Sequence, residues 1–208
     1  MKVVLRYVKY GMARFLSPLE TSKAIERNLR RAKIPLLFSQ GFHPAPLISY
    51  LDSISTGVVV RALYLTVHVE HWKEEMMERL KETSLKGLRP ENFWIFDGDI
   101  NTLADSYSFS ILLEKEFVDE KKLSADLVIR KGKKRKEYKL REILDDMKVT
   151  HLKRFMLLKY TLKRDKLFSP WEIVKGVATG EGLFIPICEE VYSRGKPLNE
   201  ILEGMING

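Results

Sequence analysis

Cysteine is almost absent from this sequence, and long apolar runs are missing from it. The single cysteine among 208 residues, Cys188, excludes an internal disulfide, a cysteine zinc site and an iron–sulfur cluster held by this chain alone. The longest run of valines, residues 58–60, is far shorter than the ~18–20 apolar residues of a transmembrane helix. Lys2 and Arg6 interrupt the N-terminal apolar residues too soon for a signal-peptide core. We therefore expect a cytoplasmic protein that makes no membrane contact.

The common sequence signatures of enzymes are also missing. The chain has no glycine-rich phosphate loop of the Walker or dinucleotide kind and no Gly-x-Ser-x-Gly nucleophile elbow. Its 4 histidines, at positions 43, 68, 71 and 151, lack the spacing of a metal site. Cys188 lies in an apolar segment, where packing is its expected role. We therefore expect no metal, no cofactor and no catalytic activity of the chain's own.

What the sequence does have is the composition of a folded, basic protein. Hydrophobic residues make up 45% of it and charged residues 31%, which is typical of a globular chain rather than a disordered one. A length of 208 residues suits one large domain or two small ones. The net charge is +8 and basic clusters occur in both halves, which favours an anionic partner such as nucleic acid.

Hydrophobic periodicity divides the first hundred residues into six elements. In the order of the chain, the sequence predicts a strand at residues 3–8, a helix at 17–32, an extended hairpin broken by a loop at 36–50, a strand at 63–69, a helix at 72–80 and a strand at 93–96. Within the strand at 63–69 we expect Leu65 and Val67 to point inward and Tyr64 and Thr66 to point outward. This order of elements is the ferredoxin-like pattern.

Polar residues at 97–101 mark a boundary, and a comparable pattern follows. The expected elements are a strand at 106–113, a hairpin at 127–140, a helix at 141–147, a strand at 155–163, a capped helix from Ser169, a strand at 184–192 and a tail helix with the apolar stripe Leu198, Ile201, Leu202 and Met205. Residues 15–20 and 167–172 both open a helix with Ser-Pro-x-Glu, which indicates related halves or simply a common helix cap. We predict an α+β fold of two tandem ferredoxin-like (βαββαβ) halves, at residues 1–100 and 105–208, with mainly antiparallel sheets.

The helix at 17–32 carries the first basic cluster. Ser17 and Glu20 form a capping-box pattern, and Pro18 occupies the first helical position, so the start of the helix is well defined. Its apolar face consists of Ala24, Ile25, Asn28, Leu29 and Ala32. The basic residues of its opposite face and its flanks are Arg14, Lys23, Arg27, Arg30, Arg31 and Lys33. Such a face attracts a phosphate backbone, and the alternative is an ordinary solvated surface.

A second basic cluster lies at the predicted hairpin of residues 127–140. Its members are Arg130, Lys131, Lys133, Lys134, Arg135, Lys136, Lys139 and Arg141. Nucleic-acid contact and a merely solvated hairpin tip are both consistent with this pattern.

The most distinctive local sequence is the loop Ser39-Gln40-Gly41-Phe42-His43-Pro44-Ala45-Pro46. The two prolines stiffen it, because each forces the preceding residue toward extended geometry. In the functional interpretation Gln40 and His43 hydrogen-bond a nucleotide and Phe42 stacks on one. In the structural interpretation Gly41 only provides an unusual turn, and Phe42 packs inward.

Residues 6–46 resemble the radical SAM-linked protein family, a bacterial domain of unknown function found fused to or encoded beside radical-SAM proteins. The resemblance rests on Gly11, Arg14-Phe15-Leu16-Ser17, Arg30-Arg31-Ala32, Pro35 and the loop at 39–46. It continues more loosely through Lys131-Gly132-Lys133, the segment 138–141 and the Ser169-Pro170 pair. The family has Ser-His-Leu-Asp where this chain has Ser17-Pro18-Leu19-Glu20, so a role of that histidine and aspartate does not carry over. The resemblance implies an accessory protein whose partner holds the iron–sulfur cluster.

The leading hypothesis is therefore a non-catalytic accessory protein that binds RNA or presents it to a separate radical-SAM RNA-modifying enzyme. The expected RNA-binding residues are Arg14, Lys23, Arg27, Arg30, Arg31, Gln40, Phe42, His43, Lys131, Lys133, Lys134 and Arg135. One alternative is a metal-independent ribonuclease with His43 as its general acid or base. Another is a protein–protein adaptor that docks through the C-terminal apolar stripe.

Overall fold

Strands and helices account for most of the chain in the computed structural model, which describes residues 1–124, 128–131 and 136–206. The strands are β1 (Lys2–Lys9), β2 (Ile48–Tyr50), β3 (Val59–His68), β4 (Leu88–Ile95), β5 (Ser106–Glu114), β6 (Val128–Lys131), β7 (Lys136–Lys139), β8 (Leu144–His151), β9 (Phe155–Lys163), β10 (Phe184–Ser193) and β11 (Lys196–Pro197). The helices are α1 (Pro18–Arg31), α2 (Glu74–Glu82), α3 (Ile100–Leu103), α4 (Lys121–Ser124), α5 (Leu140–Ile143), α6 (Trp171–Val177) and α7 (Leu198–Ile206). The single-turn 3-10 helices are η1 (Gly11–Phe15), η2 (Lys115–Phe117) and η3 (Arg164–Lys166).

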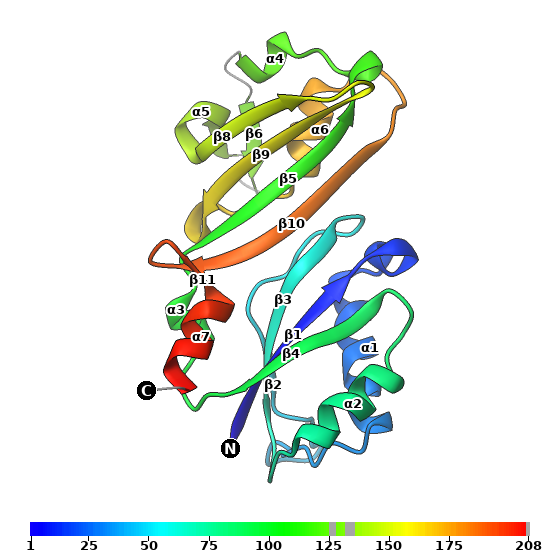
Figure 1. The fold of residues 1–208 in the computed structure, drawn as a ribbon, viewed down its shortest axis with the longest axis vertical. Coiled ribbons are helices and arrows are strands. Elements are labelled where there is room, and N and C mark those ends of the chain that lie inside the picture. The colour runs from blue at the N-terminus through cyan, green and yellow to red at the C-terminus, as the bar shows by residue number, and fades with distance from the viewer. Residues whose placement is uncertain (125–127, 132–135, 207–208) are drawn as a thin grey trace.

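One large sheet runs the length of the molecule (Figure 1). Its strand order is β4-β1-β3-β10-β5-β9-β8, with β2 added to β3 and β11 added to β10. Within the described residues β10 and β3 form its parallel pair, and the other pairs are antiparallel. The mixed α and β content and the mainly antiparallel pairing predicted from the sequence are therefore confirmed. Strands of both predicted halves share one continuous 9-stranded sheet, and β6 and β7 form a separate two-stranded sheet.

The N-terminal half has the predicted order of elements, β1-α1-β2-β3-α2-β4. Its strands pair in the order β4-β1-β3-β2. Helices α1 and α2 contribute to one hydrophobic cluster with the strands, and its members include Leu5, Leu65, Ile25, Leu29 and Leu80. Apolar side chains at alternate strand positions and at i, i+4 helical positions thus meet on one face of the sheet.

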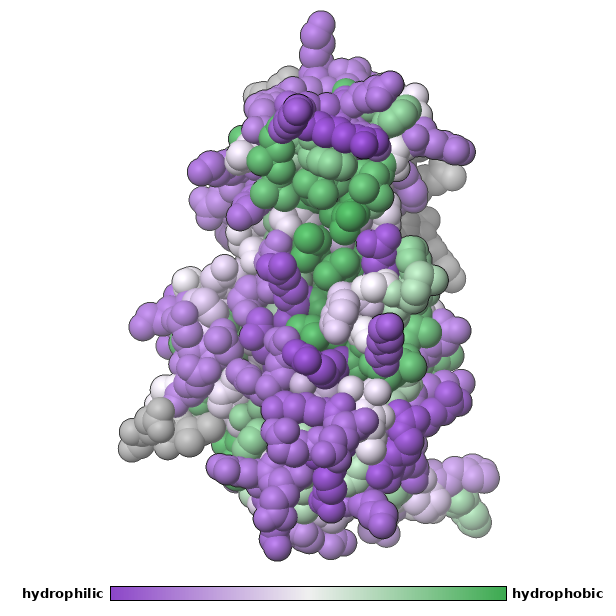
Figure 2. Space-filling model, turned by 45° about the vertical axis from the view of Figure 1, so that its right-hand side comes forward, coloured by the Kyte–Doolittle hydropathy of each residue, from purple (hydrophilic) through white to green (hydrophobic). Residues whose placement is uncertain are grey.

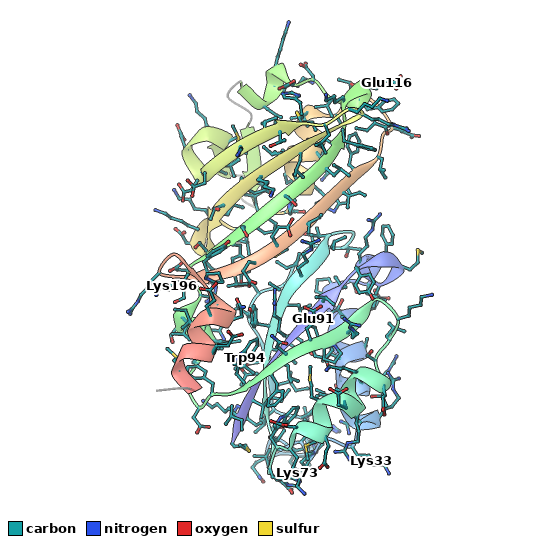
Figure 3. All side chains as sticks on the ribbon, viewed as in Figure 1. Lys33, Lys73, Glu91, Trp94, Glu116 and Lys196 are labelled. Atoms are coloured by element: carbon teal, nitrogen blue, oxygen red, sulfur yellow. The ribbon has the colours of Figure 1, made fainter. Side chains whose placement is uncertain are left out.

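The opposite face of this half is also covered, which corrects one prediction. Tyr64 and Thr66, expected to point outward, are buried. The reason is that C-terminal elements cover this face: Trp94 on β4 lies beside α7 (Figure 3) and shares a hydrophobic cluster with Leu198 and Leu202. Simple alternation predicts an exposed face only when one side of a strand is solvated, and β3 is buried on both sides.

The C-terminal half repeats the strand order of the first. Its strands pair as β10-β5-β9-β8, and all three pairs are antiparallel. The segment between β5 and β8 contains the hairpin β6-β7, which pairs as predicted. The helix predicted at 141–147 is only half right: α5 ends at Ile143, and Leu144 begins β8 by pairing with Leu162. Long-range pairing there overrides local helical periodicity.

The predicted cap at Ser169 is wrong. Helix α6 begins at Trp171 with Pro170 as its N-cap, and no side chain caps it. The backbone carbonyl of Ser169, rather than its hydroxyl, accepts the hydrogen bond from the amide of Glu172, at 2.9 Å. The sequence echo between residues 15–20 and 167–172 therefore does not produce the same local structure.

The halves are joined by polar contacts as well as by the β3–β10 pair. Arg6 on β1 forms an ion pair with Glu190 on β10 at 2.8 Å, and the hydroxyl of Tyr64 donates to the same carboxylate at 3.1 Å. The guanidinium of Arg164 donates to the carboxylate of Asp52 at 2.7 Å, and the hydroxyl of Tyr107 donates to that carboxylate too. The two contacts to Asp52 fix the segment after β2 against the C-terminal half.

Two surfaces bear on interaction hypotheses. Figure 2 shows a hydrophobic area on the upper part of the molecule, over the C-terminal strands. Half-buried Ile185, Leu112 and Leu157 form a row across β10, β5 and β9. In the tail helix, Leu198 and Leu202 are buried against the chain's own sheet, so they are not available to a partner.

In the described part of the chain, no helix combines the length and the apolar character needed to cross a membrane.

Candidate nucleic-acid interface

Helix α1 presents its basic face because its other face is anchored in the core. Ser17 caps the helix as predicted: its hydroxyl accepts from the amide of Glu20 at 3.2 Å, and the Glu20 carboxylate accepts from the amide of Ser17 at 2.8 Å. On the buried face the side-chain amide of Asn28 donates to the carbonyl of Leu80 at 3.0 Å, and its oxygen accepts from the hydroxyl of Tyr7 at 2.8 Å. This network fixes the rotation of the helix.

The basic side chains of α1 are exposed, as predicted, and differ in their contacts. Arg30 forms an i,i+4 ion pair with Glu26 at 2.8 Å, and Arg31 donates to the carbonyl of Thr83 at 2.8 Å. Lys23 and Arg27 make no hydrogen bond or ion pair with any described residue. Among the described residues, two of the four cations therefore have no hydrogen-bond or ion-pair partner, and the other two are oriented without being buried.

The loop at residues 39–46 is closed at its base and open at its tip. The amide of Ser39 donates to the carbonyl of Ala45 at 2.8 Å, and the hydroxyl of Ser39 accepts from the amide of Ala45 at 3.1 Å. Gly41 has a φ of +144°, as its predicted turn role requires. Phe42 is 102% exposed, so the inward-packing interpretation is wrong. A closed base with a bare aromatic ring at the tip is suited to stacking on an unpaired base.

The loop and the helix face form one surface, because Arg30 joins them. Its guanidinium lies over the ring of Phe38, 5.4 Å from the ring centroid, and Phe38 pairs with Pro46 across the base of the loop. We call this the helix–loop surface, and its exposed members are Lys23, Arg27, Arg30, Arg31, Gln40, Phe42 and His43. Lys33 extends it at the lower end of the molecule (Figure 3).

Arg14 does not belong to this surface. It lies in η1 before α1, where its guanidinium is 4.7 Å from the ring centroid of Phe15 and its carbonyl accepts from the amide of Gly57 at 2.8 Å. Helix α1, which is about 21 Å long, begins after Arg14 at Pro18 and ends at Arg31. Arg14 therefore precedes the helix, as predicted, and its role in binding RNA stays a prediction.

The second basic cluster is only partly described. Lys131 is the last residue of β6 and pairs with Lys136 of β7. Lys133, Lys134 and Arg135 lie outside the described residues. The role predicted for this cluster in binding nucleic acid stays a prediction.

His43 gains no support as an acid or base. Its ring is exposed, and no described residue orients it through a hydrogen bond or an ion pair. General acid–base catalysis requires a positioned proton donor or acceptor. Among the described residues, no three His, Cys, Asp or Glu side chains cluster as metal ligands.

Lys9 is a candidate functional residue that the sequence interpretation missed. It is 1% exposed at the end of β1, and it lines a cavity of about 330 Å³ together with Thr21 and Tyr50. Burial lowers the pKa of its ammonium group. The available signal was the alternation of the strand: Lys9 follows Leu5 and Tyr7 at the next inward position, where an apolar residue is expected.

Comparison with known protein families gives a match over most of the chain. A family model described as "Uncharacterized protein conserved in bacteria (DUF2344)" matches residues 2–168, which include the helix–loop surface and the cavity. No curated protein matches the chain. The description assigns no function, so the link to radical-SAM proteins expected from the sequence stays a prediction.

Proposed function

We propose that this chain, which belongs to the family of uncharacterized proteins conserved in bacteria (DUF2344), is an RNA-binding accessory protein. The observation that supports this most is the fully exposed ring of Phe42, in a loop whose base at Phe38 lies against Arg30 of α1. Cations hold a phosphate backbone, and an exposed aromatic ring stacks on an unpaired base. The helix–loop surface offers both kinds of contact, which suits a single-stranded loop or end of an RNA.

The proposed partner is a separate radical-SAM protein that modifies the bound RNA. Support comes from the resemblance of residues 6–46 and from the chemistry of Cys188. This lone cysteine is buried, so its sulfur is not exposed to a partner's cluster, and burial also raises the pKa of its thiol. The partner would hold the cluster, and this chain would hold the RNA. If the native protein co-purifies neither with a radical-SAM protein nor with nucleic acid at low salt, this assignment is wrong.

A charge-reversal experiment tests the placement of RNA on the helix–loop surface. Replacing Arg27, Arg30 and Arg31 by glutamate changes the charge of this surface by six without touching a buried side chain. We expect RNA affinity to fall at least tenfold, because several phosphate contacts are lost. The matched control reverses the exposed lysines Lys115, Lys153 and Lys196, which lie on other elements. Unchanged affinity in the first variant, or an equal loss in the control, contradicts the placement.

We also propose the finer description of the fold as two tandem ferredoxin-like halves. The shared strand order supports it, since β4-β1-β3-β2 in the first half corresponds to β10-β5-β9-β8 in the second. In the second half the chain between the first and second strands of the repeat, β5 and β8, contains α4, the hairpin β6-β7 and α5, whereas in the first half it contains α1.

A further inference from the structure

The cavity at Lys9 lies beside the first turn of α1, apart from the exposed loop at residues 39–46. One wall comes from β1 and the first turn of α1, and the other comes from the segment that follows β2. Its volume of about 330 Å³ is at the small end of the range for sites that bind small molecules. Its main lining side chains are Lys9, Pro18, Thr21, Tyr50, Asp52 and Ile54.

The ammonium group of Lys9 is buried without a compensating charge. Its Nζ atom donates to the carbonyl of Leu16 at 3.3 Å and to the hydroxyl of Thr21 at 3.5 Å, and both distances are long. The Thr21 hydroxyl in turn donates to the carbonyl of Ser17 at 2.8 Å. An ammonium has three protons to donate, so one remains unused. No carboxylate of a described residue lies within ion-pair distance of Lys9.

The one carboxylate in the lining does not neutralise Lys9. Asp52 is already paired with Arg164 at 2.7 Å and also accepts from the hydroxyl of Tyr107. The partners of the Asp52 carboxylate are thus residues of the C-terminal half. Lys9 therefore remains without an ion-pair partner among the residues that line the cavity. Burying a charge in this way is costly unless an opposite charge binds to it.

The rest of the lining is mainly apolar. Pro18, Leu19, Ile54 and Leu63 contribute alkyl groups, and Tyr50 is fixed by donating to the carbonyl of Ser22 at 3.3 Å. A cavity lined by a cation without an ion-pair partner and by several apolar side chains suits an acidic head group attached to an apolar body. We propose that this cavity binds a small organic anion, a carboxylate or a phosphate monoester, whose head group pairs with Lys9. This inference is independent of RNA binding.

Direct titration with three probes tests the proposal. Benzoate and phenyl phosphate carry the acidic head group on a ring, and benzyl alcohol has a similar size without the charge. We expect at least one anion to bind with an affinity at least tenfold above that of benzyl alcohol, measured by calorimetry and by amide chemical shifts of Thr21 and Ser53. Which anion binds distinguishes a carboxylate ligand from a phosphate ester. If neither anion binds, or if benzyl alcohol binds equally well, the proposal is wrong.

Variants assign the binding to Lys9. Lys9→Met has a similar side-chain length and removes the charge, so anion affinity should fall at least tenfold, whereas Lys86→Met, at an exposed position, should have no effect. Ser53→Trp covers the case in which Lys9→Met does not fold, because it fills the cavity from an exposed position and leaves Lys9 in place. Anion binding that survives in Lys9→Met, or in Ser53→Trp when only that variant folds, overturns the proposal.

Discussion

Replacing Lys9 by methionine should stabilise the protein, because the structure buries this ammonium with poor compensation. Removing a charge from water costs several kcal/mol even after relaxation, and hydrogen bonds to a charged group return about 1.5–3 kcal/mol each at good geometry. The two contacts of Lys9, at 3.3 and 3.5 Å, are longer than that geometry. Methionine has a similar length and leaves no buried charge. We expect a gain of about 1–3 kcal/mol in the free energy of unfolding at pH 7.

The gain should depend on pH in a defined direction. Burial lowers the pKa of Lys9 in the folded protein, so the folded state loses its proton at a lower pH than the unfolded chain, whose lysine pKa is about 10.4. Between these two pKa values the unfolded state binds more protons, and the stability of the wild type rises with pH. The advantage of Lys9→Met should therefore shrink as the pH approaches 10.

Urea denaturation at pH 7 and pH 9.5 measures both effects. For a chain of this size, 1 kcal/mol corresponds to about 2–4 °C in Tm, which gives a second readout. Lys86→Met removes an exposed charge and should change stability by less than about 0.5 kcal/mol. A Lys9→Met variant that is less stable than the wild type, or whose advantage is the same at both pH values, would refute the reasoning.

Three further predictions follow from single contacts. Phe42→Ala should weaken binding of single-stranded RNA by about 1–3 kcal/mol, the usual range for one base–aromatic stack. The urea midpoint should not change, because the ring is fully exposed. Unchanged RNA affinity contradicts the role of the loop. Arg164→Met should lower the free energy of unfolding by about 2–4 kcal/mol, because it leaves the Asp52 carboxylate without its cation. A loss below about 0.5 kcal/mol in urea denaturation argues against this link between the halves. Hydrogen bonds from the amide of Leu183 and then from Arg154 lower the pKa of Glu114. Glu114→Gln should therefore be less stable than the wild type at pH 7, and the difference should shrink as the pH falls through that lowered pKa. A stability difference that is equal at pH 7 and pH 3 contradicts this prediction.

Most of the secondary structure could be predicted because its causes are local. The capping box at Ser17 determines where α1 begins, and alternation in residues 155–163 coincides with the whole of β9. The helix–loop surface follows from the same local patterns, since the basic and apolar residues of α1 lie on opposite faces. The exposure of Phe42 was not predictable. The turn at Gly41 allows the next side chain to point either into the protein or into solvent.

The remaining features depend on contacts between distant residues. The parallel pairing of Ile187 with Val59 makes one sheet out of two halves, and nothing in either segment encodes its partner. Tyr64 is buried because α7, more than 130 positions later in the chain, covers it. The cavity at Lys9 is formed by three segments whose approach is a tertiary property, although the inward lysine in β1 was a visible exception to the apolar pattern.

The salt dependence of RNA binding tests the central claim most directly. The four cations of α1 contact at most about four phosphates, and for a single-stranded RNA each contributes about −0.7 to the slope of log K against log salt concentration. With a mixed single-stranded RNA between 50 and 200 mM salt, we predict a linear decrease with a slope of about −3 at most, reduced toward zero by glutamate at Arg27, Arg30 and Arg31. Absence of binding at 50 mM salt, or an affinity that does not change with salt, would contradict the account.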